Sequence, residues 1–293
     1  MSQASEMVRT QFKENDDIRD AGLTTPEDIA RYDDIVYGKD PVWQSLDVYR
    51  PKAAEGKKLP VIVSVHGGGW VYGDKERYQY YCMNLAQRGF AVVNFSYRLA
   101  PENKYPDPLE DANSVFIWLL DHAEQYGFDT EHVFAVGDSA GATDLGLYAA
   151  ICTNPEYAAE YDFQPPKDFA PTAIALNCGA YHIDTSKQDL TTQLMDDFLP
   201  EKGSEREIYL IGVANHVTGN YPPCFVMTCT DDFLKYQAPV MVEKLILENV
   251  PFEMHYYGDK KNLLPHVFHC DVKSQDAKVC NNETCEFFRK FLS

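Results

Sequence analysis

HVFAVGDSAG, residues 132–141, carries the strongest structural signal in the chain. A short run rich in β-branched and aromatic residues leads directly into GDSAG (137–141), and a helical pattern follows as far as about Thr153. This is the strand–turn–helix setting of a G-x-S-x-G motif, in which a tight turn presents a serine hydroxyl at the end of a sheet strand. Small residues flank the serine because the turn crowds the backbone, and glycine has no Cβ to clash. The motif predicts that Ser139 is a nucleophile.

Apolar strands alternate with helical patterns along most of the chain. Each strand is short and apolar, as is typical of strands buried on both faces. The alternation predicts an α/β fold with a mostly parallel central sheet and helices on both of its faces. The predicted strands are 61–65, 90–95, 132–136, 172–176, 224–229 and 252–257, and the predicted helices are 78–88, 108–126, 140–153, 236–248 and 281–292.

Three further segments differ from this alternation. Residues 1–31 are polar with a helical pattern, and Thr25-Pro26 is typical of a helix start. LDVYRP (46–51) alternates and stops at proline, as an edge strand would. The segment 181–221 is rich in Asp, Thr and Glu and carries apolar residues at helical spacing. We predict that it forms an inserted helical cap; the alternative is a solvated surface excursion.

A second glycine-rich motif, HGGGW (66–70), follows the predicted strand 61–65. Consecutive glycines let backbone N–H groups turn towards a ligand without hindrance from side chains. The amides of Gly68, Gly69 and Ala140 would form an oxyanion hole, in which loss of one donor costs roughly 3–4 kcal/mol. The alternatives are a simple glycine-rich turn or a phosphate loop, but neither GK[ST] nor GxGxxG accompanies the motif.

A nucleophilic serine of this type needs an acid and then a histidine, in that order along the chain. Asp231 and Asp232 come directly after the strand 224–229, at the strand end where α/β active sites gather. His266 lies in the loop after the next predicted strand. It would take the Ser139 proton and return it to the leaving group, while the aspartate holds the imidazole in the required tautomer.

HGGGW (66–70), YRLAPENKYPDPLED (97–111) and GDSAG (137–141) together resemble the hormone-sensitive-lipase-like branch (family IV) of the α/β-hydrolases, which are carboxylesterases. The resemblance covers roughly residues 55–293. It implies the α/β-hydrolase fold and the hydrolysis of small or short-acyl esters through an acyl-enzyme, with no metal and no organic cofactor.

The resemblance also implies a domain organisation. Family members usually carry N-terminal helices and a later insertion that together cover the site. We therefore expect one catalytic domain over residues 1–293, with a cap formed by about 1–40 and 181–221.

The resemblance favours one aspartate as the catalytic acid and one histidine as the catalytic base. The family's acid usually precedes Pro-Leu, and Asp232, followed by Phe-Leu, fits this pattern better than Asp231. The family's histidine often stands in His-x-Phe, which His266 matches, with His269 as the remaining candidate. The predicted catalytic residues are therefore Ser139, Asp232 and His266.

The chain departs from the family at two positions and keeps other functions open. Ala142 stands where a second glycine is usual, and Asp144 stands where an apolar residue is usual. The alternatives for Asp144 are a contact with a polar neighbour or with the cap, and the sequence favours neither. Kynurenine formamidases carry a G-x-S-A-G-A pattern close to GDSAGA, so an aryl formamide or amide hydrolase is one alternative. A non-catalytic ligand-binding member of the fold is the other.

Four residues near the motifs have structural interpretations beside functional ones. His66 is expected to support the glycine loop rather than act as a base. Asp138 is expected to brace the turn at Ser139. Trp70 and Tyr72 are predicted to line the substrate pocket, with simple packing as the alternative.

Composition excludes several partners. Lys and Arg total 26 and Asp and Glu total 45, so the formal net charge is −19. This excludes a general nucleic-acid binder, because phosphate binding depends on Lys and Arg, and it argues against an anionic membrane surface. The expected partner is a small-molecule ester, and the oligomeric state, including a homodimer, stays open. Asp196, Asp197 and Glu201 in the predicted cap would disfavour anionic substrates.

Cysteine usage and the N-terminus bear on the compartment. The eight cysteines form no CxxC pair, and Cys280 and Cys285 have no matching His or Cys pair, so no zinc site is predicted. Residues 1–17 are polar and lack the apolar core of a signal peptide, and no stretch reaches the ~18 apolar residues of a membrane span. We therefore expect a cytoplasmic protein with reduced thiols.

Overall fold

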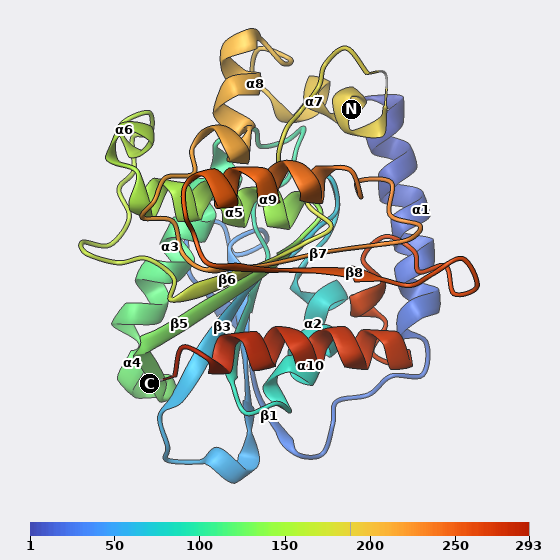
Figure 1. Ribbon diagram of the computed structural model, residues 1–293. Helices are drawn as coiled ribbons and strands as arrows, with labels where there is room; N and C mark the ends of the chain where they lie inside the picture. Colours follow the sequence, from blue (N-terminus) through green and yellow to red (C-terminus); the bar gives the residue numbers. More distant parts are fainter. Residues whose placement is uncertain (188, 293) are drawn as a thin grey trace.

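One eight-stranded sheet runs through the part of the chain that the computed structural model describes, residues 1–187 and 189–292 (Figure 1). Its strands are β1 (Ile29–Val36), β2 (Ser45–Pro51), β3 (Leu59–Val65), β4 (Ala91–Phe95), β5 (Phe128–Asp138), β6 (Ala173–Asn177), β7 (Cys224–Cys229) and β8 (Phe252–Tyr257). They lie in the order β1-β2-β4-β3-β5-β6-β7-β8. In sheet order, all neighbouring strands from β4 to β8 pair in parallel. The pairs β1–β2 and β2–β4 are antiparallel. The mostly parallel sheet is confirmed.

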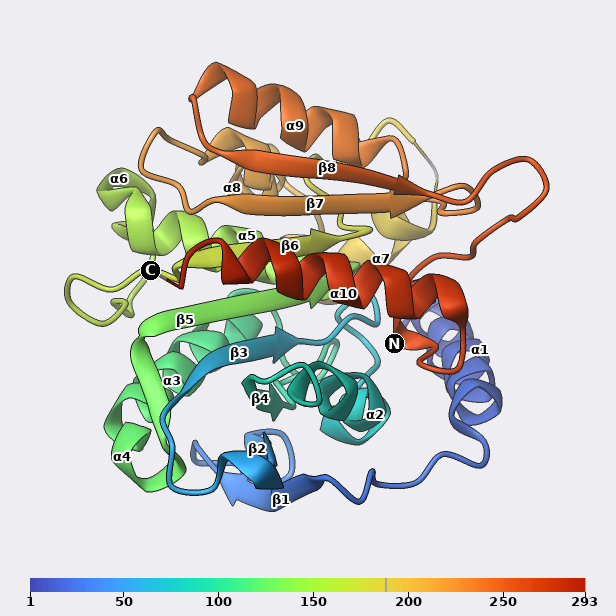
Figure 2. The same cartoon turned by 60° about the horizontal axis from the view of Figure 1, so that its bottom comes forward.

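Helices cover both faces of this sheet (Figure 2). The side chains of β3 show why, because Val61 and Val63 pack into one apolar cluster while Ile62 packs into the other. One cluster joins α3 (Asp107–Asp121), α5 (Ala140–Thr153) and α9 (Gln237–Leu247) to the sheet, and the other joins α2 (Lys75–Ala86) and α10 (Gln275–Arg289). The helices are α1 (Gln3–Asp20), α2 (Lys75–Ala86), α3 (Asp107–Asp121), α4 (Ala123–Tyr126), α5 (Ala140–Thr153), α6 (Pro155–Ala158), α7 (Leu190–Phe198), α8 (Glu205–Ile211), α9 (Gln237–Leu247) and α10 (Gln275–Arg289), with 3₁₀ turns at Lys52–Ala54, Val213–Asn215 and Phe268–Cys270.

The antiparallel edge of the sheet differs from the sequence prediction. No helix starts at Thr25; the chain enters β1 at Ile29 instead, so part of the expected 1–40 cap segment belongs to the sheet. β1 pairs along β2, which makes the predicted edge strand 46–51 an internal one. The signal of β1 was hidden because it is largely exposed and carries charges at Asp33 and Asp34, as edge strands commonly do.

The two segments expected to form a cap meet in space. α1 and α7 lie near each other in Figure 1, although more than 160 residues separate them in the chain. The backbone N–H of Ser2 and the hydroxyl of Ser5 both donate to Asp197 Oδ2, each at 2.6 Å. A carboxylate at the N-terminus of α1 also interacts favourably with the helix dipole.

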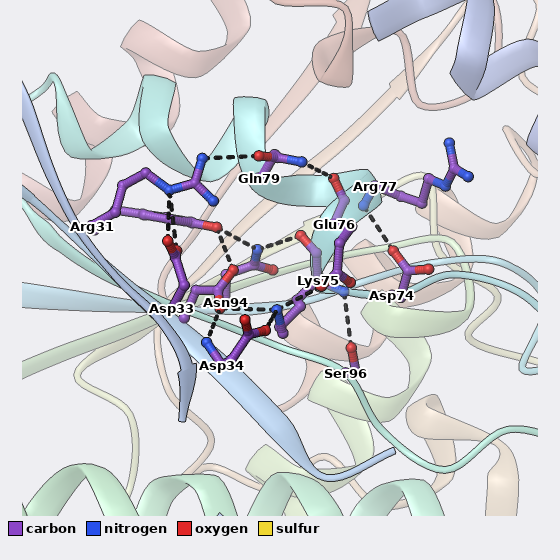
Figure 3. A network of polar contacts seen from close by, with 12 residues as sticks. Arg31, Asp33, Asp34, Asp74, Lys75, Glu76, Arg77, Gln79, Asn94 and Ser96 are labelled. Carbon is purple, nitrogen blue, oxygen red and sulfur yellow. Dashed lines mark hydrogen bonds and ion pairs between the residues drawn. The ribbon is translucent and has the colours of Figure 1, made fainter. Parts of the chain in front are cut away.

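A buried lysine ties the antiparallel edge of the sheet to α2 (Figure 3). The Lys75 side chain is 4% exposed, and its Nζ lies 2.7 Å from Asp34, 3.0 Å from Asp47 and 2.6 Å from Glu76. Its backbone carbonyl accepts a hydrogen bond from Asn94 of β4. This network holds the first turn of α2 against the sheet.

We expect Lys75→Met to lower the free energy of unfolding by about 3–5 kcal/mol, because it leaves the buried Asp47 carboxylate without its cation. Asp34→Asn is the matched control, since the Asp34 side chain is 81% exposed and exposed pairs contribute about 1 kcal/mol or less. Urea denaturation of the wild type and both variants measures the difference. Equal losses in the two variants would contradict the importance of the buried pair.

Candidate active site

Ser139 stands at a sharp turn between β5 and α5. Its φ of 52° and ψ of −121° lie in a sparsely populated region that costs energy for a residue with a Cβ. The turn brings the backbone of Gly137 and Gly141 very close to other backbone atoms. A Cβ on Gly141 would lie 2.2 Å from the Val65 carbonyl oxygen, and one on Gly137 would lie 2.4 Å from the Gly141 oxygen. Glycine is therefore required at both positions of the motif.

The structure brings three predicted residues into one hydrogen-bonded line. Ser139 Oγ lies 2.9 Å from His266 Nε2, and His266 Nδ1 lies 2.6 Å from Asp232 Oδ1. The second Asp232 oxygen accepts from Thr228 at 2.6 Å, and the Leu234 amide donates to Oδ1 at 2.8 Å. Burial opposes the charge of Asp232, but the hydrogen bond and charge of His266 hold the pKa of this carboxyl below its usual value.

The two alternative candidates, Asp231 and His269, lie outside this hydrogen-bonded line. Asp231 is exposed, whereas Asp232 is 1% exposed and bonded to His266. His269 is fully buried and contacts Asn177 and Cys270. Burial lowers the pKa of His269 to about 3, so its imidazole is neutral.

The glycine loop takes backbone conformations that only glycine adopts easily. Gly68 has a φ of 121°, and a Cβ there would lie 1.9 Å from the Tyr72 carbonyl oxygen. The loop is this tight because the amides of Val71 and Tyr72 both donate to the Gly68 oxygen. Gly69 and Ala140 both lie beside Ser139 in a narrow slot, and Ala140 is the first residue of α5, where helix N–H groups have no partner within the helix.

Buried polar groups hold the loop and the turn together. Tyr78 of α2 donates to Asp138 Oδ2 at 2.7 Å and accepts from the Gly67 amide at 3.0 Å. His66 hydrogen-bonds the Gly67 carbonyl through Nδ1 and stacks on Tyr97 at 4.0 Å between ring centroids. Burial lowers the pKa of His66 to about 4 and raises that of Asp138 to about 7. The contacts of His66 and Asp138 fit the supporting roles that the sequence predicts for them.

Asp144 has a clear partner that sequence reasoning missed. The Trp70 indole N–H donates to Asp144 Oδ1 at 2.9 Å, and both side chains are buried. Trp70 has a positive φ of 62° and stacks on Phe198 of α7 at 4.6 Å. Burial raises the pKa of Asp144 to about 7. Asp144 therefore holds the residue after the glycine loop against the helix that follows Ser139.

Two cavities of very different size adjoin Ser139. The larger has a volume of about 510 Å³ and includes Tyr72 and His266 in its lining, and the smaller is a slot of about 20 Å³ beside Trp70. The larger cavity is lined by Phe12, Asn15, Asp16, Arg19, Gly67, Gly68, Tyr72, Tyr78, Asp138, Ser139, Phe233, Pro265, His266, Val267, Phe268 and Asp271. The slot is lined by Phe12, Gly69, Trp70, Ser139, Ala140, Ala180, Leu190, Thr191, Leu194, Phe233 and Leu234.

The helix α1 contributes to the larger cavity, which no sequence motif indicated. Its residues Phe12, Asp16 and Arg19 line the cavity, whereas the sequence predicted only that residues 1–40 form part of a cap. Of the cap acids expected near the entrance, Asp197 instead accepts hydrogen bonds from the start of α1.

Among the residues that the structure describes, two groups of side chains have spacing that suits a metal ion. Asp138, His269 and Cys270 form one, and Cys178, Asp232 and His266 form the other. In the second group the carboxylate and both ring nitrogens already take part in the line from Ser139. The arrangement of Asp232 and His266 thus serves hydrogen bonding between side chains.

Comparisons with known proteins agree on one class. Residues 46–244 match the BD-FAE family model. The chain is 27% identical to the versiconal hemiacetal acetate esterase of Dothistroma septosporum, over 95% of this chain and 82% of that protein. It is 32% identical to esterase LipC of Mycobacterium tuberculosis, over 72% of this chain but only 54% of LipC. The solved structure of esterase B from Lactobacillus rhamnosis superposes with a TM-score of 0.88 and 25% identity, covering 98% of this chain and 93% of that one.

Among residues 1–187 and 189–292, no helix combines the length and the apolar character needed to cross a membrane.

We expect Asp144→Asn to change how stability depends on pH. The pKa of Asp144 is about 7 in the folded protein against an ordinary value of 3.8, so the folded state retains a proton that the unfolded state loses between these values. The wild-type free energy of unfolding therefore falls as pH rises through this window, by about 1.4 kcal/mol per pH unit from this residue. Asparagine still accepts from the Trp70 indole but does not ionise.

Urea denaturation of both proteins across this window measures the effect. The advantage of the variant should grow as pH rises and then level off above about pH 7. A difference between the two proteins that stays constant with pH would contradict the ionisation of Asp144 in this range.

Proposed function

Since the chain belongs to the BD-FAE family, and with it to the hormone-sensitive-lipase-like (family IV) α/β-hydrolase esterases, we propose that this carboxylic ester hydrolase is a serine enzyme that cleaves small, short-acyl esters through an acyl-enzyme. The observation that carries the proposal is the hydrogen-bonded line from Ser139 through His266 to Asp232. It opens onto a cavity of about 510 Å³, which is large enough for a small ligand.

In this mechanism Ser139 attacks the ester carbonyl while His266 Nε2 takes its proton. Asp232, kept ionised, stabilises the imidazolium that forms and holds Nδ1 in its protonated tautomer. The amides of Gly68, Gly69 and Ala140 stabilise the negative charge of the tetrahedral intermediate. His266 then protonates the leaving alcohol, and water releases the acyl group from Ser139 by the same steps in reverse order.

The position of His266 divides the substrate between the two cavities. The leaving alcohol must lie within reach of His266 Nε2, and the larger cavity includes His266 in its lining. The acyl group then occupies the slot, which Leu190 and Leu194 of α7 line and which His266 does not. The slot measures about 20 Å³, roughly the room that one water-sized group requires, so it favours short acyl groups such as acetyl.

The proposal also includes the domain organisation and the cellular location of the protein. α1 and the segment 181–221 act as the cap of a single catalytic domain, supported by the hydrogen bonds that join Ser2 and Ser5 to Asp197. A cytoplasmic location with reduced thiols is supported by the cysteines, none of which is paired in the part of the chain that the structure describes.

We expect Ser139→Ala and His266→Ala to lower kcat for a chromogenic acetate ester by about 10⁴-fold. His269→Gln is the matched control: it alters a neighbouring histidine that lies outside the line and should keep activity close to wild type. Loss of activity in the control with retention in His266→Ala would contradict the assignment of the base. N-formyl aromatic amides in the same assay test the amide-hydrolase alternative, which predicts that they are cleaved faster than the esters.

We expect Leu194→Ala to extend the range of acyl chains. Leu194 Cδ1 would lie 2.7 Å from a Cβ on Gly69, so this side chain closes the slot against the glycine loop. Removing it should raise kcat/KM for hexanoate relative to acetate esters by about 10-fold or more, the usual effect of a methylene-sized change in an apolar pocket. An unchanged ratio would place the acyl group outside the slot.

A further inference from the structure

The helix α1 provides a charged wall of the larger cavity. Asp16 and Arg19 line it, and their side chains are 16% and 15% exposed. The Asp16 carboxylate accepts from the Tyr72 hydroxyl at 2.9 Å and lies 2.8 Å from Arg19 Nη1. Charged groups with so little exposure next to the candidate nucleophile bear directly on which substrates can enter.

Arg19 is already neutralised and does not form an anion site. Its Nε and Nη2 donate to the two oxygens of Asp20, at 2.8 and 2.7 Å, in a bidentate pair. Nη2 also donates to the Arg77 carbonyl, and Nη1 pairs with Asp16. One guanidinium therefore serves two carboxylates, and negative charge is left in excess on this wall.

The described lining of the cavity holds further carboxyl groups but no further arginine or lysine. Besides Asp16, the described lining contains the carboxyl groups of Asp138 and Asp271, and Arg19 is its one arginine or lysine. Asp138 precedes Ser139 in the chain, is buried and accepts a hydrogen bond from Tyr78 through Oδ2. Burial raises the pKa of Asp16 despite the neighbouring Arg19, and a cation bound beside it would favour its charged form.

Aromatic side chains complete the same cavity. Phe12, Tyr72, Phe233 and Phe268 line it, with Phe12 and Tyr72 in an edge-to-face pair at 6.2 Å. The faces of aromatic rings attract cations, and a positive group gains most where a carboxylate lies close and water is largely displaced. The described lining offers an anion no unpaired cationic side chain. An ammonium group, in contrast, finds both a carboxylate and aromatic rings there.

We propose that the leaving alcohol of the substrate carries an ammonium group, and that Asp16 and the aromatic side chains of the larger cavity bind it. This rests on the proposed function, because the position of His266 assigns the alcohol to this cavity. The net charge of −19 adds to the local effect, since it raises the concentration of cationic substrates near the protein at low salt.

The test compares two acetate esters of nearly equal shape, acetylcholine and 3,3-dimethylbutyl acetate, which differ by a charged nitrogen in place of a carbon. We expect kcat/KM to be about 10-fold higher for the cationic ester at low ionic strength, mainly through a lower KM. Asp16→Asn should bring the ratio close to one, mainly by raising KM for acetylcholine.

Asp17→Asn is the matched control. Asp17 is the next residue of α1, carries the same charge and pairs with Lys13 and Arg77, but it does not line the cavity. This variant should keep the preference for the cationic ester. Loss of the preference in both variants would assign it to general charge rather than to the cavity and would overturn the proposal.

Two other outcomes would also overturn the proposal: a wild-type ratio of one or less, or a ratio that Asp16→Asn leaves unchanged. A thermal unfolding curve for Asp16→Asn, together with its activity on the neutral ester, distinguishes loss of the ammonium site from loss of the fold. If the wild type hydrolyses neither acetate ester nor a chromogenic acetate, the proposed function fails; if it cleaves the neutral ester equally well, only this inference fails.

Discussion

The close contact between Gly141 and the backbone of β3 is the constraint on which the rest of the site depends. A side chain at Gly141 would overlap the carbonyl oxygens of Val65 and His66. The contact forms because β3 and β5 are adjacent and parallel, with Val65 paired to Gly137. Both strands therefore end at the same place, and the glycine loop and the turn at Ser139 emerge side by side. The proposed nucleophile Ser139 and the proposed amide donors are positioned by backbone packing, which costs no rearrangement during the reaction.

Buried polar groups make this backbone arrangement rigid, and they have an energetic cost of their own. Tyr78 and Asp138 join the loop to the turn, while Asp144 joins Trp70 to α5. A buried carboxyl group without a cation is more stable when protonated, which is why the pKa values of Asp138 and Asp144 rise to about 7. Asp232 differs because the neighbouring imidazole favours its charged form. Similar carboxyl groups thus have different roles because their surroundings differ.

In the proposed function, chemistry and substrate selection come from different parts of the molecule. The loops after the parallel strands carry the hydrogen-bonded line, as is usual in α/β folds. The helices α1 and α7, far apart in sequence, supply the walls on the two sides of Ser139: charged and aromatic on one side, aliphatic on the other. Such walls can change without disturbing the sheet, which allows one fold to serve many substrates. This division explains why the motifs predict the reaction class far better than the substrate.

The alternation of strands and helices, the turn at Ser139 and the glycine loop could be predicted from the sequence, because apolar periodicity and glycine requirements are local properties. With the family resemblance the sequence also selected His266 over His269, and the structure places His266 beside Ser139; its catalytic role stays a prediction. Tertiary structure alone decided the exposed strand β1, the partner of Asp144 and the walls from α1. Each depends on contacts between distant residues: Asp144 and Trp70 are 74 positions apart, and no local pattern encodes such a meeting.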